Sequence, residues 1–175
     1  DNRQVDYTYD QDRTGYDYHN IGGLTTLSSS EAVYEFNFDK MGRRINETRT
    51  IDGVSYETDM FYDSAGRLEY IIYPDNERYD YSYNAMGHLQ AVSNHTTGDA
   101  YADFSDHSAL GQTGYTSYRN GASTEYSYYA GSFRLKDLNT HDINDNNIQS
   151  IHYTFDNAGN ITGMDVSTDT DASYT

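Results

Sequence analysis

The stretch Tyr62-Asp63-Ser64-Ala65-Gly66-Arg67-Leu68 carries the pattern that decides the fold of this chain. An aromatic residue precedes a short polar one, and a glycine follows three positions after the polar residue. Variants recur at 16–24 (YDYHNIGGL), 36–44 (FNFDKMGRR), 81–89 (YSYNAMGHL), 126–135 (YSYYAGSFRL) and 153–161 (YTFDNAGNI), with a weaker copy at 108–112 (SALGQ). The glycines fall at Gly22, Gly42, Gly66, Gly87, Gly111, Gly131 and Gly159, between 20 and 28 residues apart. Such a period indicates a repeat protein in which each repeat is one supersecondary unit.

Each repeat has the chemistry of a β-hairpin. In the copy at 81–89, Tyr81 and Tyr83 would share one face of a strand, because side chains alternate with period two. Asn84 favours a turn, since its short side chain accepts a hydrogen bond from the amide two residues on. Gly87 supplies a positive φ, and Leu89 resumes the strand. Because a lone hairpin is marginally stable in water, the repeats must pair edge to edge into an all-β ribbon of antiparallel hairpins.

We expect the motif positions to have an architectural role and no catalytic one. These positions are Tyr18, Gly22, Phe38, Asp39, Gly42, Tyr62, Asp63, Gly66, Arg67, Leu68, Tyr83, Gly87, Leu89, Gly111, Asn120, Gly121, Arg134, Leu135, Phe155, Asp156, Gly159 and Asn160.

The composition agrees with a folded β-protein. Leu, Ile, Val and Phe make only 27 of 175 residues, and the formal charge is −17, which together are typical of disorder. Twenty tyrosines change that interpretation, because each can bury its ring while its hydroxyl finds a partner. The length predicts one domain, residues 1–175, with a core of its own.

The same composition excludes several classes of function. Phosphate binding requires a basic surface, so the acidic chain is not expected to bind nucleic acid. No apolar stretch approaches the ~20 residues that span a bilayer. Cysteine is absent, which excludes disulfide and thiolate chemistry.

Several turns can be placed between the repeats. Asp52-Gly53 favours a two-residue hairpin turn with both φ values positive, and Asn120-Gly121 predicts a second hairpin turn. Pro74 to Glu77 form another turn, with the single proline at a strand end.

The remaining segments fit the pattern less well. Residues 7–10 (YTYD) resemble a degenerate repeat whose glycine comes late, at Gly15. Residues 93–108 are the least regular stretch, and we expect a surface loop there. Residues 142–147 (DINDNN) are expected to form a polar connection.

The second half of the chain resembles the YD repeats of the RHS superfamily. Segments 109–112 (ALGQ), 125–128 (EYSY), 133–138 (FRLKDL) and 148–162 (IQSIHYTFDNAGNIT) follow one another in that family's order, and the resemblance covers nearly the whole chain. The superfamily includes bacterial Rhs and wall-associated toxins, the B and C components of ABC (Tc) toxin complexes, and animal teneurins. The resemblance implies a curved hairpin sheet of the hollow-shell type, from a secreted or cell-surface bacterial protein. It also implies that residues 1–175 are a fragment of a longer chain, whose partners are flanking repeats, identical subunits or an enclosed C-terminal cargo.

No cofactor, metal or catalytic residue is predicted. Residues 142–147 alternate Asp and Asn like a calcium loop, but the sixth position is Asn147 and the twelfth is Tyr153, which favours a simple turn. The six histidines show no metal-binding spacing. The DPxG signature of self-cleaving bacterial relatives is missing, so no enzymatic activity is expected. Three Asn-x-Thr triplets, at Asn46, Asn94 and Asn160, are interpreted as chance.

The sequence therefore predicts a structural scaffold, namely a segment of a shell around a toxin or variable cargo. Two alternatives remain open. A ribbon with two unpaired edges could assemble into an extracellular filament or surface fibre. Exposed tyrosine faces could instead bind glycan or protein in an adhesion module, with repeats multiplying weak sites.

Overall fold

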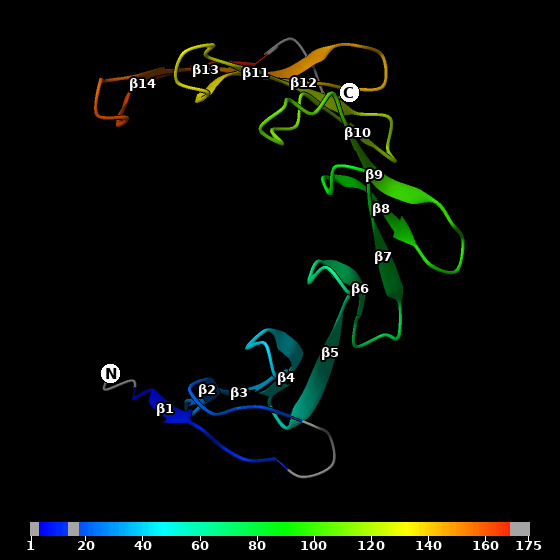
Figure 1. The fold of residues 1–175 in the computed structure, drawn as a ribbon, viewed down its shortest axis with the longest axis vertical. Coiled ribbons are helices and arrows are strands. Elements are labelled where there is room, and N and C mark those ends of the chain that lie inside the picture. The colour runs from blue at the N-terminus through cyan, green and yellow to red at the C-terminus, as the bar shows by residue number, and fades with distance from the viewer. Residues whose placement is uncertain (1–3, 14–17, 169–175) are drawn as a thin grey trace. The chain divides into compact units, whose positions relative to one another are not determined.

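A computed structural model describes residues 4–13 and 18–168 (Figure 1). The described residues form strands joined by turns, with no helix. The strands are β1 (Asp6–Tyr9), β2 (Leu24–Ser28), β3 (Ala32–Phe38), β4 (Arg44–Ile51), β5 (Val54–Tyr62), β6 (Leu68–Ile72), β7 (Arg78–Tyr83), β8 (Leu89–Asn94), β9 (Ala100–Ser105), β10 (Tyr115–Tyr118), β11 (Ser123–Tyr128), β12 (Leu135–His141), β13 (Asn147–Phe155) and β14 (Ile161–Ser167). Within these ranges no helix exists that could cross a membrane.

The strands form one open sheet of 14 strands in chain order. The described pairings are antiparallel, as between β3 and β4, where Tyr34 lies opposite Arg49. The all-β hairpin architecture predicted from the sequence is confirmed. Contacts group the chain into two compact units, residues 1–80 and 81–175, which are described separately below. The proposal of a single repeat region taken from a longer chain stays a prediction.

Turns alternate between the two sides of the sheet at which the strands end, because each hairpin reverses the chain. We call these two sides edges, as distinct from the end strands β1 and β14. Turns that follow odd-numbered strands carry the repeat motif and define the motif edge; in the described residues these are 20–23, 39–43, 63–67, 84–88, 108–112, 129–134 and 156–160. Turns that follow even-numbered strands define the opposite edge; these are 29–32, 52–53, 73–77, 94–99, 118–122 and 142–146.

The motif turns have the geometry expected of a type I turn with a bulge. At 39–43 the Asp39 amide donates to the Arg43 carbonyl, the Gly42 amide donates to the Asp39 carbonyl (both 2.9 Å), and Gly42 has φ +75°. The Asp39 carboxylate accepts the amides of Met41 and Arg43, at 2.9 and 3.0 Å. The polar residue therefore satisfies amides that the turn leaves unpaired. The backbone bonds recur at 63–67, 84–88, 108–112 and 156–160.

The opposite edge uses the same backbone turn with other residues. In turns 73–77 and 142–146 the left-handed position belongs to Asn76 and Asp145, with φ +65° each, since Asn and Asp tolerate this region better than other side chains. Asp52 and Gly53 both have positive φ, which confirms the two-residue turn predicted there. Turn 118–122 instead has only Gly121 at positive φ and belongs to the five-residue class.

Two expectations about the backbone are wrong. Residues 93–108 are not a surface loop: they include the end of β8, a turn at 94–99 and the whole of β9. Gly131 is not the left-handed residue of its repeat, because Phe133 takes φ +57° in a turn one residue longer. The turn at 94–99 has the same extra residue, which hid its hairpin from the sequence pattern. Gly15 lies outside the described residues.

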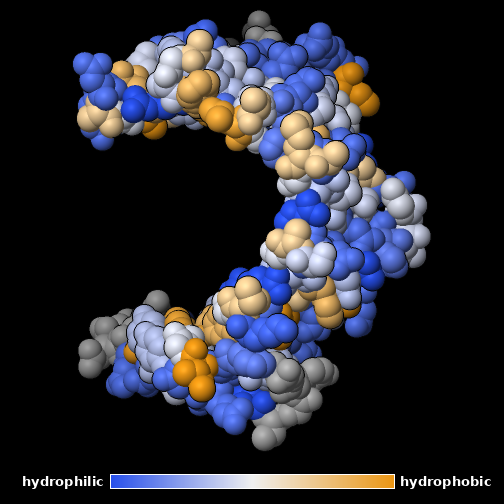
Figure 2. Space-filling model, viewed as in Figure 1, coloured by the Kyte–Doolittle hydropathy of each residue, from blue (hydrophilic) through white to orange (hydrophobic). Residues whose placement is uncertain are grey.

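The expected hydrophobic core is also absent from the described residues. Met60, 9% exposed, is the one buried apolar residue in the part of the chain that the structure describes, whereas Thr25 and Thr116 are almost fully buried (0% and 1%). In Figure 2 apolar residues are scattered among hydrophilic ones over the visible surface. A single sheet has no second layer to cover one of its faces. Burial is therefore local and polar: the Asn37 amide donates to Asn46 (3.0 Å), and that of Asn46 donates to Asp59 (2.8 Å).

Candidate functional site: the junctions between motif turns

The motif edge joins successive repeats through one recurring contact. The residue that follows the left-handed residue of one motif turn contacts an aromatic ring, the glycine or the backbone of the next motif turn. We call each such contact a junction. Five junctions lie within the two units, and they begin at Gly23, Arg43, His88, Gln112 and Arg134.

Arg43 shows how a junction is built. Its guanidinium binds the Asp39 carboxylate of its own turn at 2.6 Å. It also lies over the ring of Tyr62 in the next turn, 4.5 Å from the centroid, and the Tyr62 hydroxyl donates to the Arg44 carbonyl at 2.8 Å. A Cβ on Gly66 would lie 3.3 Å from Arg43 Nη1, so the glycine leaves room for this side chain.

The charges around this junction are set by its hydrogen bonds. Partial burial acts to raise the pKa of Asp39, but the Arg43 side chain and the amides of Arg43 and Met41 outweigh it, and the pKa is lowered. Burial raises the pKa of Tyr62, against the lowering effect of the two neighbouring arginines. The junction thus has an anionic aspartate and a neutral tyrosine at neutral pH, and Arg43 contacts both.

Arg134 forms an equivalent junction at the other end of the chain. It lies 5.5 Å from the centroid of Phe155 and donates to the Asp156 carbonyl at 3.1 Å. A Cβ on Gly159 would lie only 2.5 Å from Arg134 Nη2. The Tyr129 hydroxyl adds a bond to the Tyr153 carbonyl at 2.8 Å. Here the motif glycine is required by φ (+98°) and by the packed guanidinium.

Two junctions in the second unit use an imidazole ring or a carboxamide in place of a guanidinium. The His88 ring stacks on His107 at 5.1 Å, and a Cβ on Gly111 would lie 2.9 Å from His88 Nε2. His88 Nδ1 is buried without a hydrogen-bond partner. Gln112 donates from Nε2 to the Phe133 carbonyl at 2.5 Å. The junctions therefore share a position in the repeat, while the side chain there and the contact it makes differ.

The first junction begins at Gly23, which has no side chain. A Cβ on Gly23 would lie 2.8 Å from Cε2 of Phe38, so the Phe38 ring packs directly on the glycine backbone. The adjacent Asn20 carboxamide accepts the Phe38 amide at 3.0 Å. A ring held against the preceding turn is common to this junction and to those of Arg43 and Arg134.

The sequence-predicted motif residues occupy defined positions at this edge. The aromatic residues Phe38, Tyr62, Tyr83 and Phe155 end strands β3, β5, β7 and β13, and half-buried Leu68, Leu89 and Leu135 begin β6, β8 and β12. Tyr18 lies just before the turn at 20–23. Asn120 and Gly121 lie on the opposite edge, in turn 118–122.

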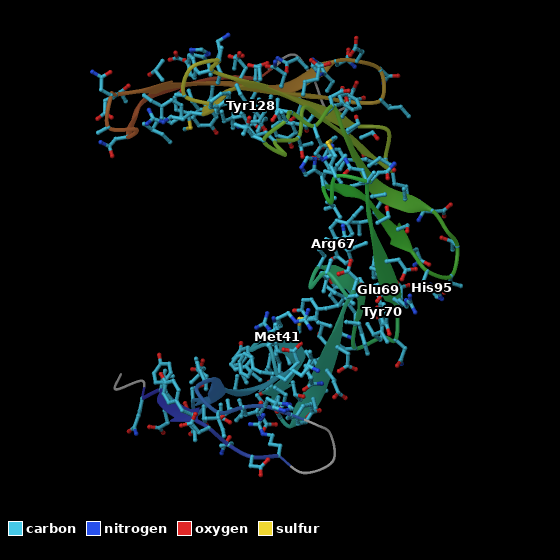
Figure 3. The ribbon with its side chains drawn as sticks, viewed as in Figure 1. Met41, Arg67, Glu69, Tyr70, His95 and Tyr128 are labelled. Carbon is cyan, nitrogen blue, oxygen red and sulfur yellow. The ribbon has the colours of Figure 1, made fainter. Side chains whose placement is uncertain are left out.

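Acidic motif residues act mainly within their own turns. The Arg67 backbone amide, followed by its guanidinium at 2.7 Å, lowers the pKa of Asp63 (Arg67 is labelled in Figure 3). The Asn160 side chain and amide similarly lower the pKa of Asp156.

Sequence reasoning missed the junction residues Gly23, Arg43, His88 and Gln112, and assigned no cross-repeat role to Arg134. A signal was present, because Arg43 and Arg67 each follow a motif glycine directly. Which partner each residue meets, about 20 residues later, depends on strand register, which the pattern does not specify.

Other groupings of polar residues have structural explanations. The Asp142 carboxylate accepts the amides of Asn144 and Asn146 at 2.8 and 2.9 Å, so residues 142–146 form a turn of the motif type. The Asn146 side chain is the first cause of the lowered pKa of Asp142. No group of three metal-ligating side chains occurs among residues 4–13 and 18–168.

A second grouping has the residue types of a hydrolase site but another geometry. Asp137 accepts Ser127 Oγ at 2.6 Å and contacts His152 Nδ1 at 2.6 Å. The hydrogen bond from His152 is the first cause of the lowered pKa of Asp137. Because the serine bonds to the carboxylate and not to the imidazole, the histidine does not activate it as a base would. The row acts as a cross-strand clamp over β11, β12 and β13.

The three Asn-x-Thr asparagines are held by the fold. Asn46 is buried within the amide ladder described above. The Asn94 side chain accepts the amides of Thr96 and Thr97 at 2.8 and 3.0 Å. The Asn160 amide binds the Asp156 carboxylate at 2.9 Å. Each asparagine therefore has a structural role.

Comparison with known proteins identifies the fold. The crystal structure of TcdB2-TccC3 matches 94% of this chain with a TM-score of 0.66 and 16% identity, and that of TcdB2-TccC3 without its hypervariable C-terminal region matches 85% with a TM-score of 0.63 and 18% identity. The chain therefore has the fold of the region that it matches in these structures, an open sheet of antiparallel hairpins. A third match, to TcdB2-TccC3-Cdc42, has a TM-score of 0.63 and 17% identity. This chain covers only 8 to 9% of the chains it matches. No family model and no curated protein matches the sequence.

Proposed function

We propose that this RHS-type sheet is a non-catalytic structural scaffold, a segment of a shell that encloses the C-terminal toxin or variable cargo of a longer polypeptide. The polypeptide would be secreted or displayed on a bacterial surface. The observation that supports the proposal is the row of junctions, in which motif turns within each unit hold the next one in a sheet whose described residues include almost no hydrophobic core. Such an architecture gives an extensible wall rather than a globular domain.

The likeness to TcdB2-TccC3 supports the same proposal at the level of fold. The chain corresponds to less than a tenth of that structure, which fits one arc of a larger wall. Its partners would then be flanking repeats of the same chain, paired through strands β1 and β14. Every residue of β1 is exposed, and Val166 at the far edge is 50% exposed, which leaves both end strands accessible to further strands.

The test begins with the natural polypeptide in the source material. We expect an intact mass far above the 19.9 kDa of this chain, and a region C-terminal to it that resists protease while the wall is closed. Arg43→Ala combined with Arg134→Ala removes two junctions and should open the region to cleavage. Lys40→Ala serves as a matched control on the motif edge. Equal cleavage in the natural protein and the double variant would show that the wall does not shield a cargo.

The exposed end strands β1 and β14 also favour a second candidate, a self-assembling filament. Unpaired backbone groups on an edge strand can pair with another copy of the same edge. A mature species near 20 kDa that forms fibres would support this function and contradict the single-chain shell. The glycan-binding alternative stays a prediction, to be tested on a glycan panel with Tyr→Ala variants.

A further inference from the structure

We propose that the motif edge is a docking surface for the motif edge of a second copy of this chain. The starting observation is a recurrence of exposed apolar side chains at the turn tips. Ile21, Met41, Met86 and Leu110 directly precede a left-handed glycine and are 92%, 71%, 70% and 63% exposed. Phe133, at the left-handed position of the longer turn, is 52% exposed. We call these five residues the apolar tips; Met41 is labelled in Figure 3.

Turn geometry does not explain the tips. The same backbone turn on the opposite edge has Asp75, Asn120 and Asn144 at the equivalent position. Ala65 and Ala158 occupy this position in the two remaining motif turns, so a small residue also suffices. Single exposed apolar residues are ordinary, but their repetition at one position along one edge marks an interaction surface.

Charge indicates which surfaces can meet. Within the motif turns Asp39 and Asp63 pair with Arg43 and Arg67, and Asp156 has uncharged partners in Asn160 and the turn amides. On the opposite edge, five of the six described turns carry an acidic residue, namely Glu31, Asp52, Asp75 with Glu77, Asp99, and Asp142 with Asp145. Asp99 pairs with Arg119 of the neighbouring turn at 2.7 Å, and the other four of these turns contain no Lys or Arg. Two opposite edges would bring an excess of carboxylates together and repel each other. The motif turns instead carry three carboxylates against four cations, Lys40, Arg43, Arg67 and Arg134, so two motif edges bring apolar tips together without a large net charge.

Spacing supports the same partner. Motif turns recur every second strand, so neighbouring tips lie about 9.6 Å apart, twice the spacing between paired strands. In the second unit the contacts of His88 with Gly111 and of Gln112 with Phe133 hold three such turns in sequence. A second motif edge has the same period by construction, so tips of one copy fit between tips of the other. Docking of this kind does not depend on whether the sheet encloses a cargo.

The absence of cysteine makes the proposal directly testable. Single-cysteine variants Leu110→Cys, on the motif edge, and Ile143→Cys, an equally prominent tip on the opposite edge (72% exposed), are oxidised in dilute solution. We expect disulfide-linked dimers from Leu110→Cys and none from Ile143→Cys. Met164→Cys on β14 reports pairing through the end strand instead.

Sedimentation of the full 175-residue chain gives an independent readout. We expect Met86→Asp with Leu110→Asp to weaken self-association at least about tenfold, while Ile143→Asp leaves it unchanged, with circular dichroism confirming that each variant is folded. Met86→Ser with Leu110→Ser repeats the test without added charge. In an equimolar mixture of the two cysteine variants, cross-linking of Leu110→Cys only to Ile143→Cys would overturn the proposal. An effect of Ile143→Asp on self-association equal to that of Met86→Asp with Leu110→Asp would overturn it too. A wild-type chain that stays monomeric at high concentration would overturn it as well.

Discussion

The Arg43 junction in the first unit and the His88 junction in the second occupy the same position, directly after a motif glycine. They differ in whether the polar atoms of the side chain have hydrogen-bond partners. Arg43 reaches Tyr62 while its own guanidinium is bound by Asp39. His88 reaches His107 with a ring nitrogen that is buried and has no partner. The glycine of the next turn lies beside the side chain in both. The comparison shows that different side chains can occupy the space beside the next motif glycine. We expect the hydrogen bonds and ion pairs of that side chain to set how much each junction contributes to stability.

Glycine replacements should reveal the shared shape most strongly. Gly111→Ala places a methyl group at a left-handed φ and against the His88 ring, 2.9 Å from Nε2. Gly42→Ala is the matched control, because φ is +75° there and no atom lies within 4 Å. We expect Gly42→Ala to cost about 1–2 kcal/mol of unfolding free energy, from φ alone, and Gly111→Ala to cost about 3. Equal denaturation midpoints would show that the His88 contact is not a constraint.

Replacement of Arg43 by alanine tests the junction whose charged side chain has an ion-pair partner. Arg43→Ala removes the ion pair with Asp39 and the contact with the Tyr62 ring, and we expect a loss of about 1–2 kcal/mol in chemical denaturation. Lys40→Ala on the same turn should change the free energy of unfolding by less than about 0.5 kcal/mol. Similar losses for both would mean that the junction contributes nothing beyond a surface charge.

Removal of the unsatisfied nitrogen tests the other junction. His88→Phe keeps an aromatic ring against His107 and Gly111 but eliminates the buried Nδ1. Because an unpaired buried polar atom destabilises a protein by about 1–3 kcal/mol, we expect His88→Phe to stabilise the chain by about 1 kcal/mol. A lower thermal midpoint for this variant would show that the nitrogen has a partner in solution.

The smallest expected effect concerns pH. The folded pKa of Asp63 lies below its ordinary value, chiefly through the Arg67 amide and then the guanidinium. A depressed carboxyl pKa contributes stability above the unfolded value, near 4, and that contribution is lost as pH falls through the folded value. Asp63→Asn keeps the turn acceptor, as Asn84 does in the next repeat, but removes the charge. The variant should be slightly less stable than the wild type at pH 7 and equal to it in strong acid; a constant difference at all pH values would contradict the linkage.

The sequence by itself determined the hairpin order and most turn positions. The motif turns require a left-handed φ, which glycine provides, as at Gly42. They also require a polar side chain that accepts hydrogen bonds from turn amides, as at Asp39. Both requirements are local, so their repetition can be recognised in the sequence. The same local reasoning failed where the turn is one residue longer, at 94–99 and 129–134, because Gly98 and Phe133 fall out of register with the motif.

Only the tertiary structure decided what holds the repeats together. A hydrophobic core was expected, but the sheet has one layer, and the buried groups of the described residues are mainly polar side chains, such as the hydrogen-bonded Asn46 and Thr25. The partner of Arg43 lies 19 to 23 residues away, at Tyr62 and Gly66, and becomes its neighbour only when strands β4 and β5 pair in one particular register. A short-range pattern carries no information on that register, because it is set by the combined pairing of both strands and the bulges at their ends.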